Sequence, residues 1–259
     1  MGTRAPIELS RRSIITGAAS AGTGLLAGIA LARKTSAATV AGPMKPVQPL
    51  APGNASLPVA FIMDDGATMI DFAGPWEVFQ DAGFAAGVPG FSLFTVASGP
   101  GPYQTTGNVV GSAAAMHMTG LKFTPDYTFD NAPQPKVVVM GAQGDGRNLK
   151  KLEWIRAVAQ QADVVMSVCT GAFVLANTGL LDGLKATTHH NFYDQFAQRF
   201  PKIELIRGMR FVDNGKLITA GGLSSGIDGA LHVVNRYYGA SAAQKVADNM
   251  EYQGTGWKT

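Results

Sequence analysis

The sequence predicts an α/β domain built on an open parallel β-sheet with helices on both faces. Short β-rich segments alternate with helix-patterned segments over about 200 residues from Pro58 onward. The segment 163–168, DVVMSV, is almost entirely apolar, which is typical of a parallel strand covered on both faces. A chain of this length can bury a full hydrophobic core as one domain.

The individual elements follow this alternation along the chain. Strand patterns occupy four segments, 58–63, 91–97, 136–140 and 163–168. Helix patterns occupy five, 69–83, 148–162, a helix from Gly171, 191–200 and a long helix from Ser225. In the first helix, Ile70, Ala73, Val78 and Phe79 form an apolar face that we expect to be broken at Gly74-Pro75. The segment 209–220 predicts a pair of strands joined by a turn at Asn214-Gly215.

The first 41 residues predict a twin-arginine signal peptide. Paired Arg11-Arg12 precede a Gly- and Ala-rich apolar stretch, and small residues suited to signal peptidase follow it. A membrane anchor is the alternative, because residues 13–32 are long enough to span a bilayer, although they are weakly hydrophobic. We therefore expect recognition by the twin-arginine export machinery, cleavage near Ala38 or Ala41, and a periplasmic or secreted protein.

The remaining chain reads as a short linker and one domain. Residues 42–57 are proline-rich and without periodicity, which predicts an exposed linker before a domain at 58–259. The net charge of +3 includes five basic residues and one acidic residue within 1–38, so the mature part carries about −1. With no basic cluster among aromatic residues, we expect no nucleic-acid partner.

Cys169 is the only cysteine, and it lies between the strand at 163–168 and a helix that opens at Gly171. It could be a buried structural thiol or half of an intermolecular disulfide. In open α/β sheets, however, ligands bind where strands end and helices begin, and a helix N-terminus stabilises a thiolate. Gly171 supplies the small residue that a sharp strand-to-helix turn requires. The placement therefore makes Cys169 a candidate nucleophile.

Asp71 is the candidate acid. A carboxyl group at the start of the first helix can reach the same edge of the sheet as Cys169. Like charge and burial would raise its pKa and keep a proton available for donation. The alternative is a helix-capping aspartate, a role that is compatible with the first.

Two further motifs have structural and functional interpretations. His189, in ATTHH, could pair with Cys169 as a base, whereas His117 and His232 are expected to be structural. The glycine-rich segment 220–228 lacks a phosphate-binding pattern, and its Ser225-x-x-Asp228 fits a helix capping box. Gly222 would allow close approach to the cleft.

Four scattered histidines and one cysteine do not form a ligand cluster, so we expect no metal.

Three segments, 70–79, 167–190 and 219–234, together resemble the ThiJ/PfpI superfamily of glutamine amidotransferase-like proteins, and most closely its isocyanide hydratase branch. The similarity covers residues 59–254. It implies a flavodoxin-like domain, usually a homodimer, whose nucleophile on a strand-to-helix elbow falls on Cys169. The acid that touches the nucleophile falls on Asp71, and the neighbouring hydroxyl falls on Thr170.

The resemblance also implies substrate-binding positions at Gly141, Ala142, Gly171, His189 and Gly222. Members usually have Pro-Gly-Gly after the strand that matches 136–140, and this chain has Met140-Gly141-Ala142. The Ala142 Cβ narrows the space there, so anion stabilisation by the backbone amides would be altered.

The implied activity is hydration of a small-molecule isocyanide to an N-substituted formamide, without a cofactor. A glyoxalase- or deglycase-like enzyme that acts on reactive carbonyls is one alternative. A non-catalytic exported binding or redox-sensing protein, in which Cys169 is oxidised, is another. Related domains precede helix-turn-helix modules in AraC-type regulators, but no such pattern occurs in this sequence.

Overall fold

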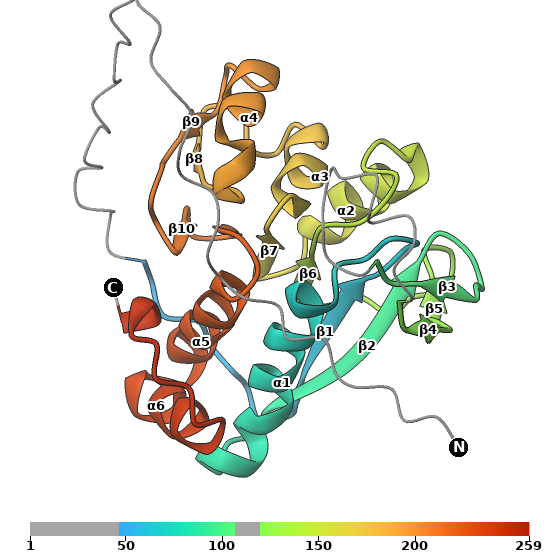
Figure 1. The fold of residues 1–259 in the computed structure, drawn as a ribbon. Helices are drawn as coiled ribbons and strands as arrows, with labels where there is room; N and C mark the ends of the chain where they lie inside the picture. Colours follow the sequence, from blue (N-terminus) through green and yellow to red (C-terminus); the bar gives the residue numbers. More distant parts are fainter. Residues whose placement is uncertain (1–46, 107–119, 259) are drawn as a thin grey trace, which may run out of the picture. The chain divides into compact units, whose positions relative to one another are not determined.

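The computed structural model describes residues 47–106 and 120–258, and its centre is a seven-stranded, mostly parallel sheet (Figure 1). The spatial order of its strands is β10-β11-β7-β6-β1-β2-β5. Their bounds are β1 Leu57–Ile62, β2 Phe91–Ala97, β5 Tyr127–Thr128, β6 Val137–Met140, β7 Val164–Val168, β10 Phe211–Asp213 and β11 Leu217–Ala220. All neighbouring pairs are parallel except β10 and β11, which form the antiparallel hairpin expected around Asn214-Gly215.

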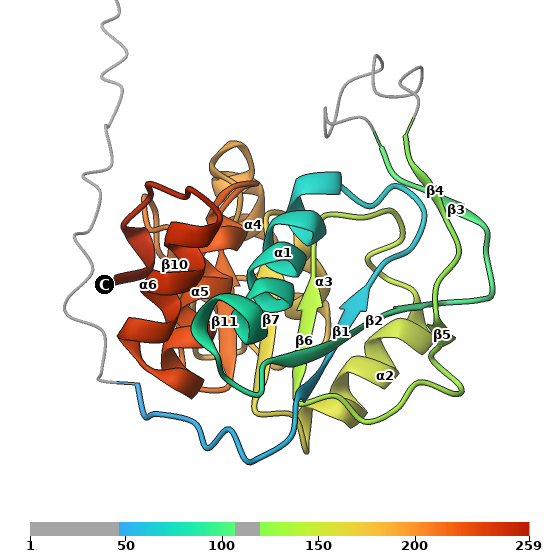
Figure 2. The same ribbon diagram turned by 90° about the horizontal axis from the view of Figure 1, so that it is seen from below.

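Helices cover both faces of this sheet (Figures 1 and 2). Their bounds are α1 Met69–Ala86, α2 Leu149–Ala159, α3 Gly171–Asn177, α4 Tyr193–Arg199, α5 Ser225–Tyr238 and α6 Ala240–Asn249. Figure 1 shows α1, α5 and α6 on one side of the sheet and α2, α3 and α4 on the other. The predicted α/β class and its open parallel sheet are therefore confirmed.

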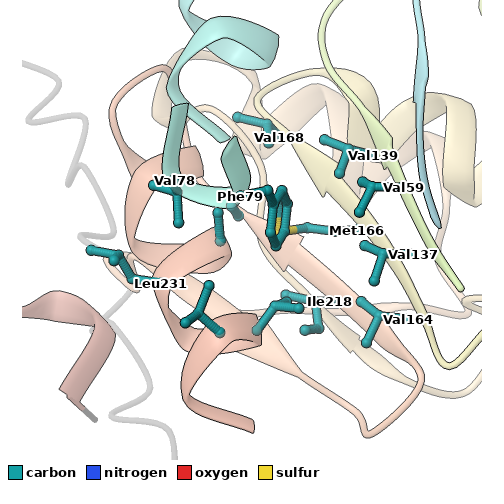
Figure 3. Close-up of a cluster of buried hydrophobic side chains, with 14 of the residues drawn as sticks. Val59, Val78, Phe79, Val137, Val139, Val164, Met166, Val168, Ile218 and Leu231 are labelled. Atoms are coloured by element: carbon teal, nitrogen blue, oxygen red, sulfur yellow. The ribbon is translucent and has the colours of Figure 1, made fainter. Parts of the chain in front are cut away.

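Each face of the sheet has its own apolar core. Figure 3 shows part of the core under α1 and α5, where side chains of both helices pack on alternate residues of the strands. Its labelled members are Val59, Val78, Phe79, Val137, Val139, Val164, Met166, Val168, Ile218 and Leu231. The second core takes the other side chains of the same strands and packs them against Leu152, Ile155 and Leu175. Because both faces are covered, β6 and β7 are buried at every position, as their apolar character predicts.

Helix α1 differs from the expectation of a break at Gly74-Pro75. It continues to Ala86, with Pro75 inside it. Proline lacks the N–H that would bond the carbonyl of Asp71, but packing on the sheet holds the helix together. Gly74 faces α5, where an added Cβ would lie 2.9 Å from Cγ1 of Ile227. The Gly-Pro pair thus permits a close helix contact and does not end the helix.

Three short strand pairings and one helix were not predicted. Strand β5 extends the main sheet, β3 Tyr103–Gln104 pairs with β4 Lys122–Phe123, and β8 Lys185–Ala186 pairs with β9 Glu204–Leu205. Helix α6 follows α5 after Gly239 and packs against α1 and α5. The segment expected as one helix at 191–200 begins as a 3₁₀ turn, His190–Phe192, before α4.

The N-terminal expectations fall largely outside the described residues. The signal peptide, its apolar stretch and residues 42–46 all lie there, as does His117. Residues 47–56 form no helix or strand, yet they contact the domain: the Leu50 N–H donates to the Arg236 carbonyl, and Leu50 packs on the core. Leu57, expected as the end of the linker, is the first residue of β1. Within the described residues, no helix is long and apolar enough to span a membrane.

The parallel strands bring the predicted site residues to one edge of the sheet. Ile62 pairs with Met140, and Met140 pairs with Ser167, so β1, β6 and β7 end side by side. The residues that follow these strands therefore meet at their carboxyl ends, where α/β proteins bind ligands.

Candidate active site

Cys169 lies on a strained turn between β7 and α3. Its φ of 59° is in the left-handed region, which non-glycine residues seldom adopt. Two hydrogen bonds hold this backbone: the Cys169 N–H donates to the Gly221 carbonyl at 2.7 Å, and Thr188 Oγ1 donates to the Cys169 carbonyl at 2.8 Å. The cysteine is thus on a strand-to-helix elbow, as predicted.

Gly171 follows this elbow at a point of close backbone approach. A Cβ at Gly171 would collide with the carbonyl oxygen of Met140 at the end of β6. The first turn of α3 can therefore pass β6 only with glycine at this position. Gly171 was expected to line the substrate site, and the close contact with β6 gives it a structural role.

Asp71 is buried in the first turn of α1 and faces the elbow. Its Oδ2 accepts a 2.8 Å hydrogen bond from the Ala142 N–H. Its Oδ1 is also buried and makes no hydrogen bond of normal geometry; the Cys169 thiol and the Leu223 N–H are the polar groups that face this carboxyl. The residue before the helix is Thr68, so Asp71 does not act as its cap. One oxygen is therefore fixed and the other is free to hold a proton beside the thiol.

Burial dominates the acidity of both groups in this pair. It raises the pKa of Asp71 to about 6, against the opposing effect of the Ala142 N–H, the Cys169 thiol and the Leu223 N–H. Burial, and next the charge of Asp71, raise the pKa of Cys169 to about 12, while the N–H groups of Thr170 and Leu223 act in the opposite direction. The thiolate expected from the helix N-terminus is therefore not the resting form. At neutral pH the pair holds one proton, and that proton is on sulfur.

The loop after β6 positions the Asp71 carboxyl group. An added Cβ at Gly141 would lie 2.5 Å from the Asp71 Cβ, so only glycine admits the carboxyl at this place. The Ala142 N–H, expected to face the substrate, is occupied by Asp71 Oδ2, and the Ala142 carbonyl accepts from Thr68 N–H. This loop fixes the orientation of the acid.

His189 packs against Gly222 and makes no hydrogen bond with the Cys169 thiol. A Cβ at Gly222 would collide with Cδ2 of His189, so the imidazole lies directly on that glycine. His189 Nδ1 accepts from the Asn191 N–H at 3.2 Å, which places the proton of the neutral ring on Nε2. Burial and then His190 lower the pKa of His189. The structure gives no hydrogen bond between His189 and Cys169, and Asp71 is the ionisable group that faces the thiol.

Leu223 and Thr188 are the site residues that sequence reasoning missed. Leu223 has a φ of 52°, and this left-handed conformation places its N–H near both the sulfur and Asp71. Leucine seldom adopts this region of φ, so the residue type at position 223 does not predict the left-handed conformation. Thr188 had a weak signal, since it precedes His189 directly.

The segment expected as a capping box forms a different contact. Ser225 is the first residue of α5 and Ser224 precedes it without a capping hydrogen bond. Asp228 instead accepts hydrogen bonds from Arg210 Nε at 2.6 Å and from the Tyr252 hydroxyl at 3.0 Å. The Asp228 carboxylate therefore binds these two side chains and does not cap α5.

His232 and the described carboxylates, histidines and cysteine form no metal site at the elbow. His232 is buried on α5, where its Nε2 lies 2.7 Å from Asp213 Oδ2, far along the chain from the elbow. In the parts of the chain that the structure describes, no three His, Cys, Asp or Glu side chains gather as metal ligands.

The fold and this elbow define the class of protein. Residues 58–236 match the model of the DJ-1/PfpI family, and the chain belongs to that family. A ThiJ/PfpI family protein from Pseudomonas syringae has the same fold, with a TM-score of 0.64 at 24% identity over 79% of this chain and 78% of that one.

The chain is also similar to proteins of different function. It is 32% identical over 202 residues to isonitrile hydratase of Pseudomonas putida, which covers 76% of this chain and 79% of the hydratase. It is 29% identical over 137 residues to the helix-turn-helix transcriptional regulator GbdR of Pseudomonas aeruginosa, which covers 52% of this chain and 37% of the regulator. Proteins similar to this chain thus include an enzyme and a transcriptional regulator, and the choice between these functions depends on the site.

Proposed function

We propose that this protein is a cofactor-free, cysteine-dependent lyase that hydrates isocyanides to N-substituted formamides. The buried pair of Asp71 and Cys169 is the observation that carries the proposal. An isocyanide has one terminal carbon that must accept both a nucleophile and a proton, and a thiol beside a carboxylate can supply both. The similarity to isonitrile hydratase supports this choice of substrate.

In the first step, the Cys169 thiol gives its proton to Asp71 while the sulfur attacks the terminal carbon of the isocyanide. Asp71 then donates that proton to the same carbon, and the product is a thioimidate with a C–S and a new C–H bond. Because Asp71 has a pKa of about 6, it can accept and return a proton near neutral pH. The N–H groups of Thr170 and Leu223 stabilise the sulfur while it carries charge.

In the second step, water attacks the thioimidate carbon and one of its protons moves to nitrogen. The tetrahedral intermediate then breaks its C–S bond, the hydroxyl proton returns to the sulfur–Asp71 pair, and the formamide leaves. Thr170 carries the hydroxyl that follows the nucleophile directly in the sequence, and in this proposal it positions the water. Each turnover consumes one isocyanide and one water.

Two features of the site weigh against the alternative functions. A glyoxalase-like mechanism would use His189 as the base of Cys169, and no hydrogen bond joins them. A redox sensor needs a thiol with a low pKa. Burial, and next the charge of Asp71, raise the pKa of the Cys169 thiol.

The test is a turnover assay of the full chain on a panel of alkyl and aryl isocyanides, with methylglyoxal as the competing substrate. Formamide production that is lost in Cys169→Ala and strongly reduced in Asp71→Asn supports the proposal. Full hydration by Cys169→Ala refutes it. Methylglyoxal turnover that exceeds isocyanide turnover and depends on His189 would favour the glyoxalase-like alternative.

A further inference from the structure

A concave region lies beside the elbow, on the side of α3 and α4. It has a volume of about 490 Å³, within the range of small-molecule sites, and its walls come from the loop 143–147, α3, and the segment from Phe192 to Arg199. Thr170 belongs both to this wall and to the elbow, whereas Cys169 is not part of the wall. We call this region the α3–α4 pocket.

Two arginines give the α3–α4 pocket its charge. Arg147 and Arg199 both line it, and within residues 47–106 and 120–258 neither guanidinium pairs with a carboxylate. Burial and then the charge of Arg147 lower the pKa of Arg199, so the two cations lie close enough to repel each other. Two neighbouring cations that form no ion pair favour the binding of an anion.

Arg199 is held in place before any ligand arrives. Its Nη2 donates to Asn177 Oδ1 at 3.1 Å, and its guanidinium lies 5.2 Å from the Phe200 ring centre and 5.9 Å from that of Phe173. A guanidinium fixed by an amide and two rings loses little side-chain entropy when it binds a planar oxyanion.

The remaining wall limits the kind of anion. Phe173 and Phe192 pack edge to face at 6.4 Å and offer an apolar surface for a hydrocarbon body. Asp145 also lines the pocket, so the net charge of its ionisable side chains is one positive charge and not two. That balance favours a monoanion over a dianion. From these features we infer that the α3–α4 pocket binds a small monocarboxylate with an apolar body, through Arg199 and Arg147.

This inference goes beyond isocyanide hydration and holds whether or not that activity is found, because the ligand needs no isocyano group. Benzoate is a suitable probe, since it joins a planar carboxylate to one aromatic ring. Benzamide has the same shape without the charge, and phenyl phosphate offers a dianion. Titration calorimetry of the full chain with each compound compares the three directly.

We expect benzoate to bind more tightly than benzamide or phenyl phosphate. Arg199→Gln loses one charge-assisted hydrogen bond, so the affinity for benzoate should fall about tenfold or more. Arg147→Gln should lower this affinity by a smaller factor. Among the described residues the Arg147 side chain has no hydrogen-bond partner, so its replacement should leave folding intact even if Arg199→Gln does not. Arg207→Gln is the matched control, because Arg207 already pairs with Asp194 on α4 and should leave the affinity unchanged.

Three results would overturn the inference. Equal affinity for benzoate and benzamide would remove the role of charge, and tighter binding of phenyl phosphate would reject a monocarboxylate. Wild-type affinity for benzoate in both Arg147→Gln and Arg199→Gln would show that these arginines do not form the site.

Discussion

The Asp71 carboxyl group and the Cys169 thiol face each other in full burial, and the charge of Asp71 raises the pKa of Cys169. Each group therefore controls the protonation of the other. The backbone fixes both partners: the Ala142 N–H holds Asp71, and the Gly221 carbonyl holds the Cys169 N–H. One proton shared by a nucleophile and an acid is what the addition of a thiol to an isocyanide requires.

The first prediction concerns the acidity of the thiol. Asp71→Asn removes a negative charge beside the sulfur, so the pKa of Cys169 should fall from about 12 but stay above its ordinary value, because burial is the larger cause. Cys169 is the only cysteine, so ultraviolet absorbance of the thiolate reports it directly against a Cys169→Ser blank. An unchanged or higher thiol pKa in Asp71→Asn would show that the two groups do not interact.

The second prediction concerns stability and pH. Burial raises the pKa of Asp71 from 3.8 to about 6, so the folded state binds this proton more tightly than the unfolded state. The stabilisation is complete below the unfolded pKa and is lost as the pH rises through about 6, a change of about 3 kcal/mol. Urea unfolding of wild type and Asp71→Asn should show wild type losing stability relative to the variant between pH 4 and 6. A constant difference across this range would contradict the raised pKa.

The third prediction concerns the loop that orients Asp71. In Gly141→Ala, the new Cβ would lie 2.5 Å from the Asp71 Cβ, so the loop or the acid must move. We expect a stability loss of about 1–3 kcal/mol and a much larger fractional loss of hydratase activity. Gly83→Ala in α1 is the control, since its Cβ would meet no atom closer than 3.6 Å. Equal activity in the two variants would mean that the position of Asp71 is not critical.

The fourth prediction concerns a buried ion pair behind the same loop. Lys151 on α2 is fully buried and lies 2.7 Å from Asp64 Oδ2, and its ammonium also donates to the Asp145 carbonyl. Lys151→Met leaves a largely buried carboxylate without its cation, so unfolding by urea should show a loss of about 3–5 kcal/mol. The neighbouring pair of Lys150 and Asp130 is exposed, and Lys150→Met should cost about 0–1 kcal/mol. Similar losses in the two variants would reject the structural role of Lys151.

The sequence predicted the parts of the fold that repeat a strong local pattern. The apolar segments at 58–63 and 163–168 became β1 and β7 within one residue at each end, because buried parallel strands are apolar throughout. Strands of two residues, such as β5 and β8, have no periodicity of their own and form only where the chain meets a partner strand. Helix α1 passes Pro75 because packing compensates for one lost hydrogen bond.

The candidate site was predicted in its positions and less well in its chemistry. Cys169 and Asp71 could be placed at one edge from the order of strands and helices. The protonated resting state of Cys169 could not be predicted, because its position before a helix suggests a thiolate. Burial, and next the charge of Asp71, reverse that preference. The orientation of the Ala142 N–H and the left-handed Leu223 depend on contacts between distant loops, and local sequence does not encode them.

The central claim is that Cys169 forms a covalent thioimidate with an isocyanide. Mass spectrometry of protein quenched during turnover tests it most directly, because addition has no leaving group and the adduct has the full mass of the isocyanide. We expect this mass on the peptide that contains Cys169, at a higher level at early times than after the substrate is consumed, and not in Cys169→Ala. Formamide production at the wild-type rate by Cys169→Ala, with no adduct on any peptide, would contradict the account.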